Sequence, residues 1–109
     1  FRADTMLSTR VAVSRDPTDP HLRVRWARAL EEASKATMAA REFRGALRLA
    51  TDESAPIDEA ASGLIRLGDA AGCVIVLDAQ IEDARRAPGL MSALQSARER
   101  CVEAAKKSY

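Results

Sequence analysis

The chain has 109 residues, which suits a single domain, and its 17 Lys and Arg residues against 16 Asp and Glu residues give a formal net charge of +1 at pH 7. Charges this evenly balanced create no global field that would attract nucleic acid or an anionic membrane. Alanine is the commonest apolar residue and only 4% of the chain is aromatic, so the composition favours helices over strands.

The sequence also bears on where the protein works. No apolar run approaches the roughly 18 residues that a membrane span needs, and the first residues do not form a signal peptide. We therefore expect a cytoplasmic protein without a membrane partner. Because the chain begins at Phe1 and not at a methionine, we expect residues 1–109 to be a single all-helical domain taken from a longer chain.

The first predicted element is a short helix over residues 3–14, in which Ala3, Leu7 and Val11 recur at every fourth position with Met6 beside them. The segment "SRDPTDP" ends this helix, because a residue before proline avoids the helical region.

A second, stronger helix is predicted to begin at Pro20, since proline suits the first helical position and Asp19 can cap the helix. It extends to about residue 39 and turns near "MAARE", and another apolar stripe follows until "TDESA" ends it. The apolar positions of the two helices are Leu22, Trp26, Ala29, Leu30, Ala33 and Thr37, then Phe43, Ala46, Leu47 and Ala50.

Two more prolines, Pro56 and Pro88, restart the helical pattern. Asp58 and Glu59 follow the first, in a turn where the helix dipole favours acids. The helix after Pro88 carries its cations in the C-terminal half, which the dipole also favours. The apolar faces are Ile57, Ala60, Ala61 and Leu64, and then Leu90, Met91, Leu94, Ala97, Cys101, Ala104 and Ala105.

The stretch "RLGDAAGCVIVL" between these two prolines allows two interpretations. It could be a loop that leads into a β-branched strand, or a helix that ends at Gly68 before a second helix capped by Asp69. We favour two helices, because the four-residue rhythm continues for about 17 residues, which is too long for a strand. The positions in this rhythm are Cys73, Leu77, Ile81 and Ala84, with Val74 beside them.

Cys73 and Cys101 are too far apart for a CxxC motif, and no cluster of histidines or cysteines accompanies them, so zinc is not expected. We expect two buried free thiols, because cysteine often serves as a small apolar residue. The alternative is a disulfide between two packed helices, which would imply an oxidising compartment.

The helix-starting prolines Pro20, Pro56 and Pro88 are 36 and 32 residues apart, and a period near 34 residues is typical of helical-repeat arrays. The unit "PIDEAASGLIRLGDAAGCVIVLDAQI" resembles a tetratricopeptide repeat, and residues 29–50 resemble one more loosely, without a glycine at the corner. The first hairpin is also similar to the microtubule-interacting-and-trafficking domain. Both resemblances imply a binding module. The positions that carry the first resemblance are Ile57, Ala60, Ala61, Leu64, Gly68, Asp69, Cys73 and Leu77.

No pattern in the sequence predicts catalysis. His21, the only histidine, falls in the first turn of a helix and is expected to be a surface residue, and Trp26 is expected to pack in the core. "GDAAGC" lacks the Lys-Ser/Thr of a phosphate-binding loop, and no Gly-x-Ser-x-Gly elbow occurs. We therefore expect no enzyme, no cofactor and no metal site.

The expected fold is all-α, with five or six helices in antiparallel hairpins that form either a tetratricopeptide-like solenoid fragment or a closed helical bundle. The expected function is a non-enzymatic interaction or scaffold module, because the first helices of stacked hairpins line a surface that binds a peptide or a partner helix. The alternative is a dimerising structural or sensory bundle. The candidate binding residues are Asp58, Ser62, Ile65 and Arg66, with Ser92, Ser96 and Glu99 on the last helix.

Overall fold

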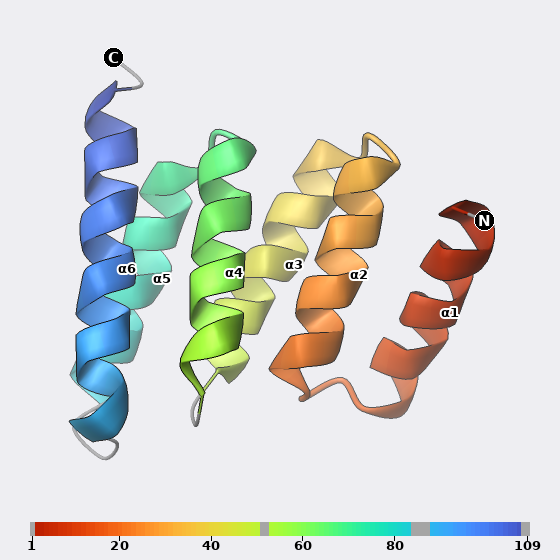
Figure 1. Cartoon of the computed structure of the whole chain (residues 1–109), viewed down its shortest axis with the longest axis horizontal. Helices are drawn as coiled ribbons and strands as arrows, with labels where there is room; N and C mark the ends of the chain where they lie inside the picture. The colour runs from red at the N-terminus through yellow and green to blue at the C-terminus, as the bar shows by residue number, and fades with distance from the viewer. Residues whose placement is uncertain (1, 51–52, 84–87, 108–109) are drawn as a thin grey trace.

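The computed structural model describes residues 2–50, 53–83 and 88–107, and over these ranges the chain forms six helices and no strand (Figure 1). The prediction of an all-α fold is therefore confirmed. No helix in the described ranges is both long and apolar enough to cross a membrane. The helices are α1 (Arg2–Arg15), α2 (Pro20–Glu32), α3 (Ala36–Leu49), α4 (Ser54–Arg66), α5 (Ala70–Asp83) and α6 (Pro88–Lys107).

Five of the helices form two layers, and α1 packs against α2 at one end (Figure 1). The front layer consists of α2, α4 and α6 side by side, and the back layer consists of α3 and α5. The chain therefore alternates between the layers, and the molecule is a slab of 38 × 35 × 16 Å. The three prolines spaced by about one repeat length all fall in the first turn of a front-layer helix.

The start of α2 and the corner between α4 and α5 form as predicted. Asp19 Oδ1 accepts a hydrogen bond of 2.9 Å from the His21 N–H, and Pro20 occupies the first helical position. Gly68 adopts a φ of 79°, the left-handed conformation that ends a helix and that glycine tolerates best. The stretch "RLGDAAGCVIVL" is therefore a helix end, a corner and a new helix.

The corner between α2 and α3 lies elsewhere than predicted. It spans residues 33–35, with Ser34 at a φ of 62°, whereas the sequence suggested a helix to about residue 39. No glycine or proline marks this corner, and Ala33 continues the apolar pattern of α2 into it. Thr37, predicted to continue the stripe of α2, is therefore an exposed residue of the first turn of α3.

The core lies between the two layers. Phe43 packs on Gly63 of α4, where an added Cβ would lie 2.5 Å from the ring, so only glycine allows this approach. On α2, Leu30 is buried as predicted, but the other buried residues, Val24 and Ala27, lie outside the predicted stripe, and Trp26 is only partly buried. The fully buried predicted residues include Phe43, Ala46, Leu47, Ile57, Ala60, Ala61, Leu64, Cys73, Leu77, Ala97 and Cys101.

Three predictions on side chains concern residues whose side chains the structure does not describe, Ala3, Met6 and Leu7, and a fourth concerns Ala84, which lies outside the described ranges. Val11 is described and is 43% exposed, so it does not pack fully against α2.

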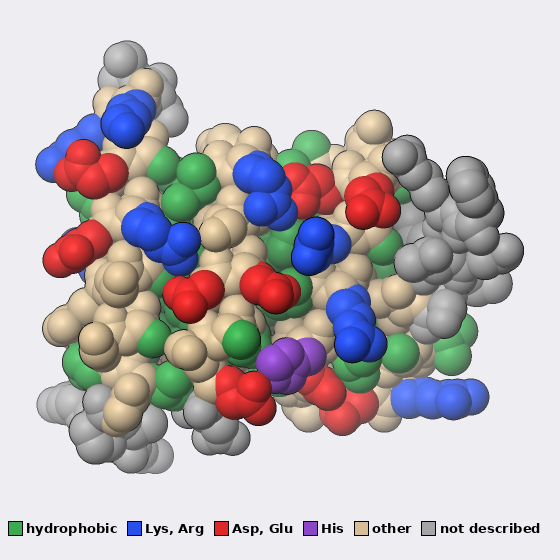
Figure 2. All heavy atoms as spheres, viewed as in Figure 1, with side chains coloured by type: hydrophobic (Ala, Val, Ile, Leu, Met, Phe, Trp, Pro, Cys, Tyr) green, Lys and Arg blue, Asp and Glu red, His purple; other side chains and the backbone are tan. Residues whose placement is uncertain are grey.

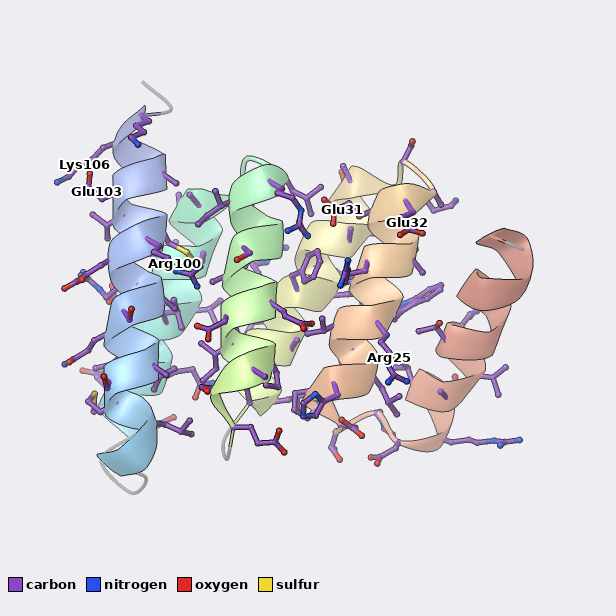
Figure 3. The ribbon with its side chains drawn as sticks, in the orientation of Figure 1. Arg25, Glu31, Glu32, Arg100, Glu103 and Lys106 are labelled. Atoms are coloured by element: carbon purple, nitrogen blue, oxygen red, sulfur yellow. A yellow bond between two sulfur atoms is a disulfide. The ribbon has the colours of Figure 1, made fainter. Side chains whose placement is uncertain are left out.

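Cys73 and Cys101 form a disulfide that joins α5 to α6 (Figure 3). Their Cα atoms are 6.2 Å apart, and both residues are fully buried. The preferred prediction of two free thiols is wrong, and the alternative of a disulfide between packed helices holds. The two cysteines, 28 positions apart, form no sequence motif, because the pairing depends on both facing inward from adjacent antiparallel helices.

Candidate functional site

The seven candidate binding residues all belong to the front layer. α4 lies between α2 and α6, so its outward residues can meet side chains from both neighbours (Figure 1). Figure 2 shows this face, on which positive and negative side chains alternate over the three helices. On α4 the candidates are Asp58, Ser62, Ile65 and Arg66, and on α6 they are Ser92, Ser96 and Glu99.

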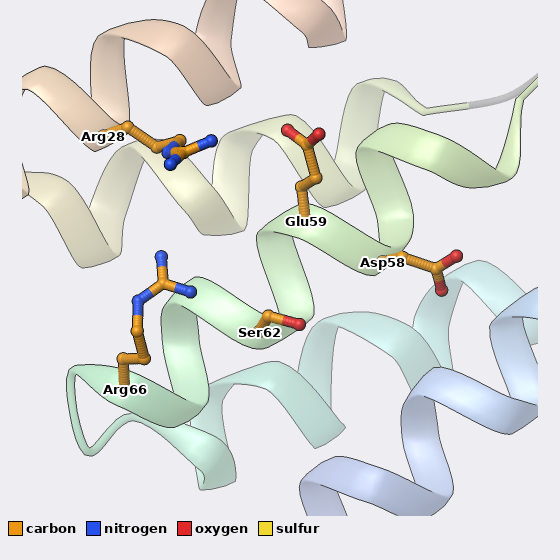
Figure 4. A pocket seen from close by; sticks show the side chains of 5 residues that line it. All are labelled: Arg28, Asp58, Glu59, Ser62 and Arg66. Atoms are coloured by element: carbon orange, nitrogen blue, oxygen red, sulfur yellow. The ribbon is translucent and has the colours of Figure 1, made fainter.

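One hollow, of about 220 Å³, lies between α2 and α4. Arg28 extends from α2 and Glu59 extends from α4, and the two side chains point toward one another across it (Figure 4). Both are exposed, and neither has a hydrogen-bond or ion-pair partner among the described residues. Asp58, Ser62 and Arg66 complete the lining.

Arg66 is bound within the chain. Its Nε and Nη2 donate to the two carboxylate oxygens of Glu31 on α2, over 3.0 and 2.9 Å. This hydrogen bonding holds the pKa of Glu31 below its usual value and raises the pKa of Arg66. Arg66 therefore links α4 to α2 and does not present a free charge.

Arg100 on α6 makes a similar link to α4 (Figure 3). Its Nη1 donates to Ser62 Oγ over 3.2 Å, and its Nη2 lies 3.5 Å from Asp58 Oδ1. Two of the predicted candidates are thus held by a residue that the sequence did not single out. Nothing in the sequence indicates this contact, because the partners are about 40 residues apart and on different helices.

Arginine–carboxylate pairs of this kind also join other parts of the two layers. Arg23 on α2 contacts Glu42 on α3 at 2.9 Å. Arg44 on α3 pairs with Asp69 at the α4–α5 corner, and Arg98 on α6 pairs with Asp78 on α5. These links use charged side chains from every helix of the two layers.

A second hollow, of about 470 Å³, lies between α4 and α6. Ile65 of α4 and Ala104 of α6 contribute apolar surface, and charged side chains surround it. Lys107 and Glu99 at its rim have no ion-pair partner among the described residues. Arg100 and Glu103 complete the lining, whereas Ser92 and Ser96 line neither hollow.

The only histidine of the sequence lines neither of the two hollows. His21 is a surface residue, as predicted, with its Nε2 2.8 Å from Glu53 Oε2. Within the described ranges, no group of three or more His, Cys, Asp and Glu residues is placed to hold a metal ion. No family model, no curated protein and no solved structure matches the chain.

Proposed function

We propose that the chain is a non-enzymatic protein–protein interaction module that binds an extended peptide segment across its front layer. The observation that carries this proposal is the pair of hollows on either side of α4, one with an unpaired cation and anion and the other with an apolar floor. A surface of this kind supplies both orientation by charge and burial of an apolar side chain.

The layer order supports a tetratricopeptide-like array as the scaffold of this module. Each front-layer helix that is followed by a described helix forms a hairpin with it, α2 with α3 and α4 with α5. The first helices of successive hairpins therefore share one face, which is the face that such arrays use for binding.

The side chains that line the two hollows indicate which residues the bound peptide segment should carry. Arg28 would pair with a carboxylate, and the Ile65 hollow would take a small apolar side chain. Lys107 at the rim of that hollow offers a second cation for an acidic group. The preferred partner is thus a segment in which acidic residues flank an apolar one.

A random peptide library displayed on phage tests this function. We expect the wild-type chain to enrich acidic–apolar segments, and Arg28→Glu or Ile65→Lys to weaken binding of those peptides by about tenfold. Asp58 and Arg66 are left intact because their substitution would also break the links between helices.

Two matched substitutions in the back layer, Arg41→Glu and Ile75→Lys, serve as controls and should bind the selected peptides, offered in solution as single copies, like the wild type. Circular dichroism of every variant should show unchanged helix content. Failure to enrich any peptide, or equal binding by the front-layer variants, would rule out this function.

The disulfide also bears on the cellular compartment in which the protein works. Disulfides persist in oxidising compartments, so we propose that the chain works there and not in the cytoplasm. Alkylation of the protein in denaturant under non-reducing conditions, directly on cell lysis, should leave Cys73 and Cys101 unmodified, because the denaturant exposes both buried residues to the reagent. Labelling of both thiols would support the cytoplasmic location instead.

A further inference from the structure

The outward face of the back layer carries two stripes of residues that the described chain leaves uncovered. The stripe on α5 is apolar in its first half, where Ile75 is 71% exposed between Ala71 and Ala79, and acidic at its end. The stripe on α3 contains Met38, which is 49% exposed, and two exposed arginines. The α3 stripe is Met38, Arg41, Gly45 and Arg48, and the acids of α5 are Asp78, Glu82 and Asp83.

No neighbour of Gly45 in the described part of the chain requires a glycine at this position. A glycine inside a helix costs about 0.5–1 kcal/mol relative to alanine. At Gly63 the ring of Phe43 requires it, but a Cβ at Gly45 would meet nothing within 4 Å. Gly45 therefore leaves a gap between Arg41 and Arg48 that opens outward.

The two stripes stand in register. α3 and α5 run in the same direction (Figure 1), and Gln80 Nε2 donates to the Arg48 carbonyl over 3.0 Å, which places these two residues within about one helical turn of the same height. Counting back with equal rise, Gly45 and Ile75 also lie within about one turn of each other along the axis. Arg48 lies near the acidic end of α5.

We propose that this face is the interface of a two-fold dimer of the chain, with the symmetry axis parallel to α3 and α5. Such an axis keeps every residue at its height and places α3 of one chain over α5 of the other. Ile75 then enters the gap at Gly45 of the partner subunit, and Arg48 faces Asp83 of the partner subunit. Each contact occurs twice, as two-fold symmetry requires.

The distribution of charge favours this axis over a two-fold axis perpendicular to the helices. An axis perpendicular to the helices would place α3 over a second α3 and α5 over a second α5. The arginines would then face arginines or Met38, and the acids would face the apolar half of α5. Arg48 and Asp83 have no ion-pair partner in the described part of the chain, so both are available for the arrangement with opposite charges in contact.

The size of the face sets the strength of the dimer. Two 14-residue helices, each about 21 Å long and about 10 Å wide, offer roughly 400 Å² of flat area per chain. This is about half of the ~800 Å² that each partner contributes to a standard interface, so the dimer is weak and forms at micromolar concentrations or above.

Sedimentation equilibrium of the wild-type chain over a range up to about 1 mM tests the dimer, whose expected mass is twice the 11.8 kDa of one chain. Gly45→Gln fills the gap with a better helix former and should raise the dissociation constant at least about tenfold. Its melting temperature at low concentration should equal or exceed that of the wild type, which separates loss of the dimer from loss of folding.

Charge exchange provides the second arm. Arg48→Glu and Asp83→Arg should each weaken the dimer, and the double variant should restore it, because the exchanged pair meets again across the interface. Arg28→Glu on the front layer is the matched control and should dimerise like the wild type. A wild-type chain that stays monomeric, or a dimer that Gly45→Gln leaves unchanged, would overturn the proposal.

Discussion

Arginine has two roles in this chain that the sequence does not distinguish. One set crosses between helices and is paired with carboxylates, and another set has no ion-pair partner among the described residues. Both sets fall between the apolar positions of their helices, and a face shared with a neighbouring helix and a face open to solvent look alike in sequence. The paired residues are Arg23, Arg44, Arg66, Arg98 and Arg100, and the others include Arg28, Arg41 and Arg48.

The Glu31–Arg66 pair predicts a pH dependence of stability. Because its folded-state pKa lies below its usual value of 4.5, Glu31 contributes stability above pH 4.5 that is lost as the pH falls through the folded pKa. Glu31→Gln should lower the free energy of unfolding by about 0.5 kcal/mol at pH 7, since the Arg66 side chain is half exposed and solvent screens the pair. At pH values below the folded pKa the variant and the wild type should unfold at the same urea concentration.

Glu59→Gln is the control for this measurement, because Glu59 has no hydrogen-bond or ion-pair partner among the described residues. It should leave the urea midpoint nearly unchanged at both pH values. An effect of Glu31→Gln that persists at acid pH would show that the carboxylate charge is not its cause.

At the scale of the helices, the sequence predicts best where a proline and a glycine bracket one apolar face. α4 has this pattern between Pro56 and Gly68, and its apolar positions Ile57 and Leu64 are buried as expected. α2 has apolar residues on two faces, because it packs against α1 as well as the core, and its end has no glycine. A single stripe drawn through α2 therefore misplaces both its core face and its end.

The disulfide is the strongest single constraint between two helices, and its removal should be measurable. Replacing Cys73 and Cys101 together by alanine opens a loop of 28 residues, and the chain-entropy relation gives a loss of about 3.5 kcal/mol in the free energy of unfolding. Urea unfolding of the oxidised wild type and the double variant measures this difference. A reductant should lower the stability of the wild type but not that of the variant, and a difference below about 1 kcal/mol would contradict the expectation.

At the scale of the molecule, the two proposals use opposite faces of the slab. A back-layer dimer leaves both front layers exposed on opposite sides, so each chain keeps its own peptide site. Two linked sites would strengthen binding to a partner that carries two copies of the segment, without a new contact. The sequence suggests a binding surface and a dimer as rivals, and the two-layer architecture makes them compatible.

The layered architecture also predicts that stability is unevenly distributed. Among the helices that the structure describes, α1 packs against α2 alone, whereas α3, α4 and α5 each contact at least three others. A helix with one neighbour opens locally at a lower free energy than one held on several sides. Amides of α1 should therefore exchange with deuterium at least about a hundredfold faster than those of α4 under native conditions.

Hydrogen exchange followed by mass spectrometry resolves these helices as separate peptides. Of the other described helices, α6 contacts α4 and α5, and the disulfide also joins it to α5, so its protection should fall in the reduced protein while that of α1 stays the same. Equal protection of α1 and α4 would mean that the six helices open as one cooperative unit. That result would favour a closed bundle over an array in which each hairpin is stabilised mainly by contacts with its nearest neighbours.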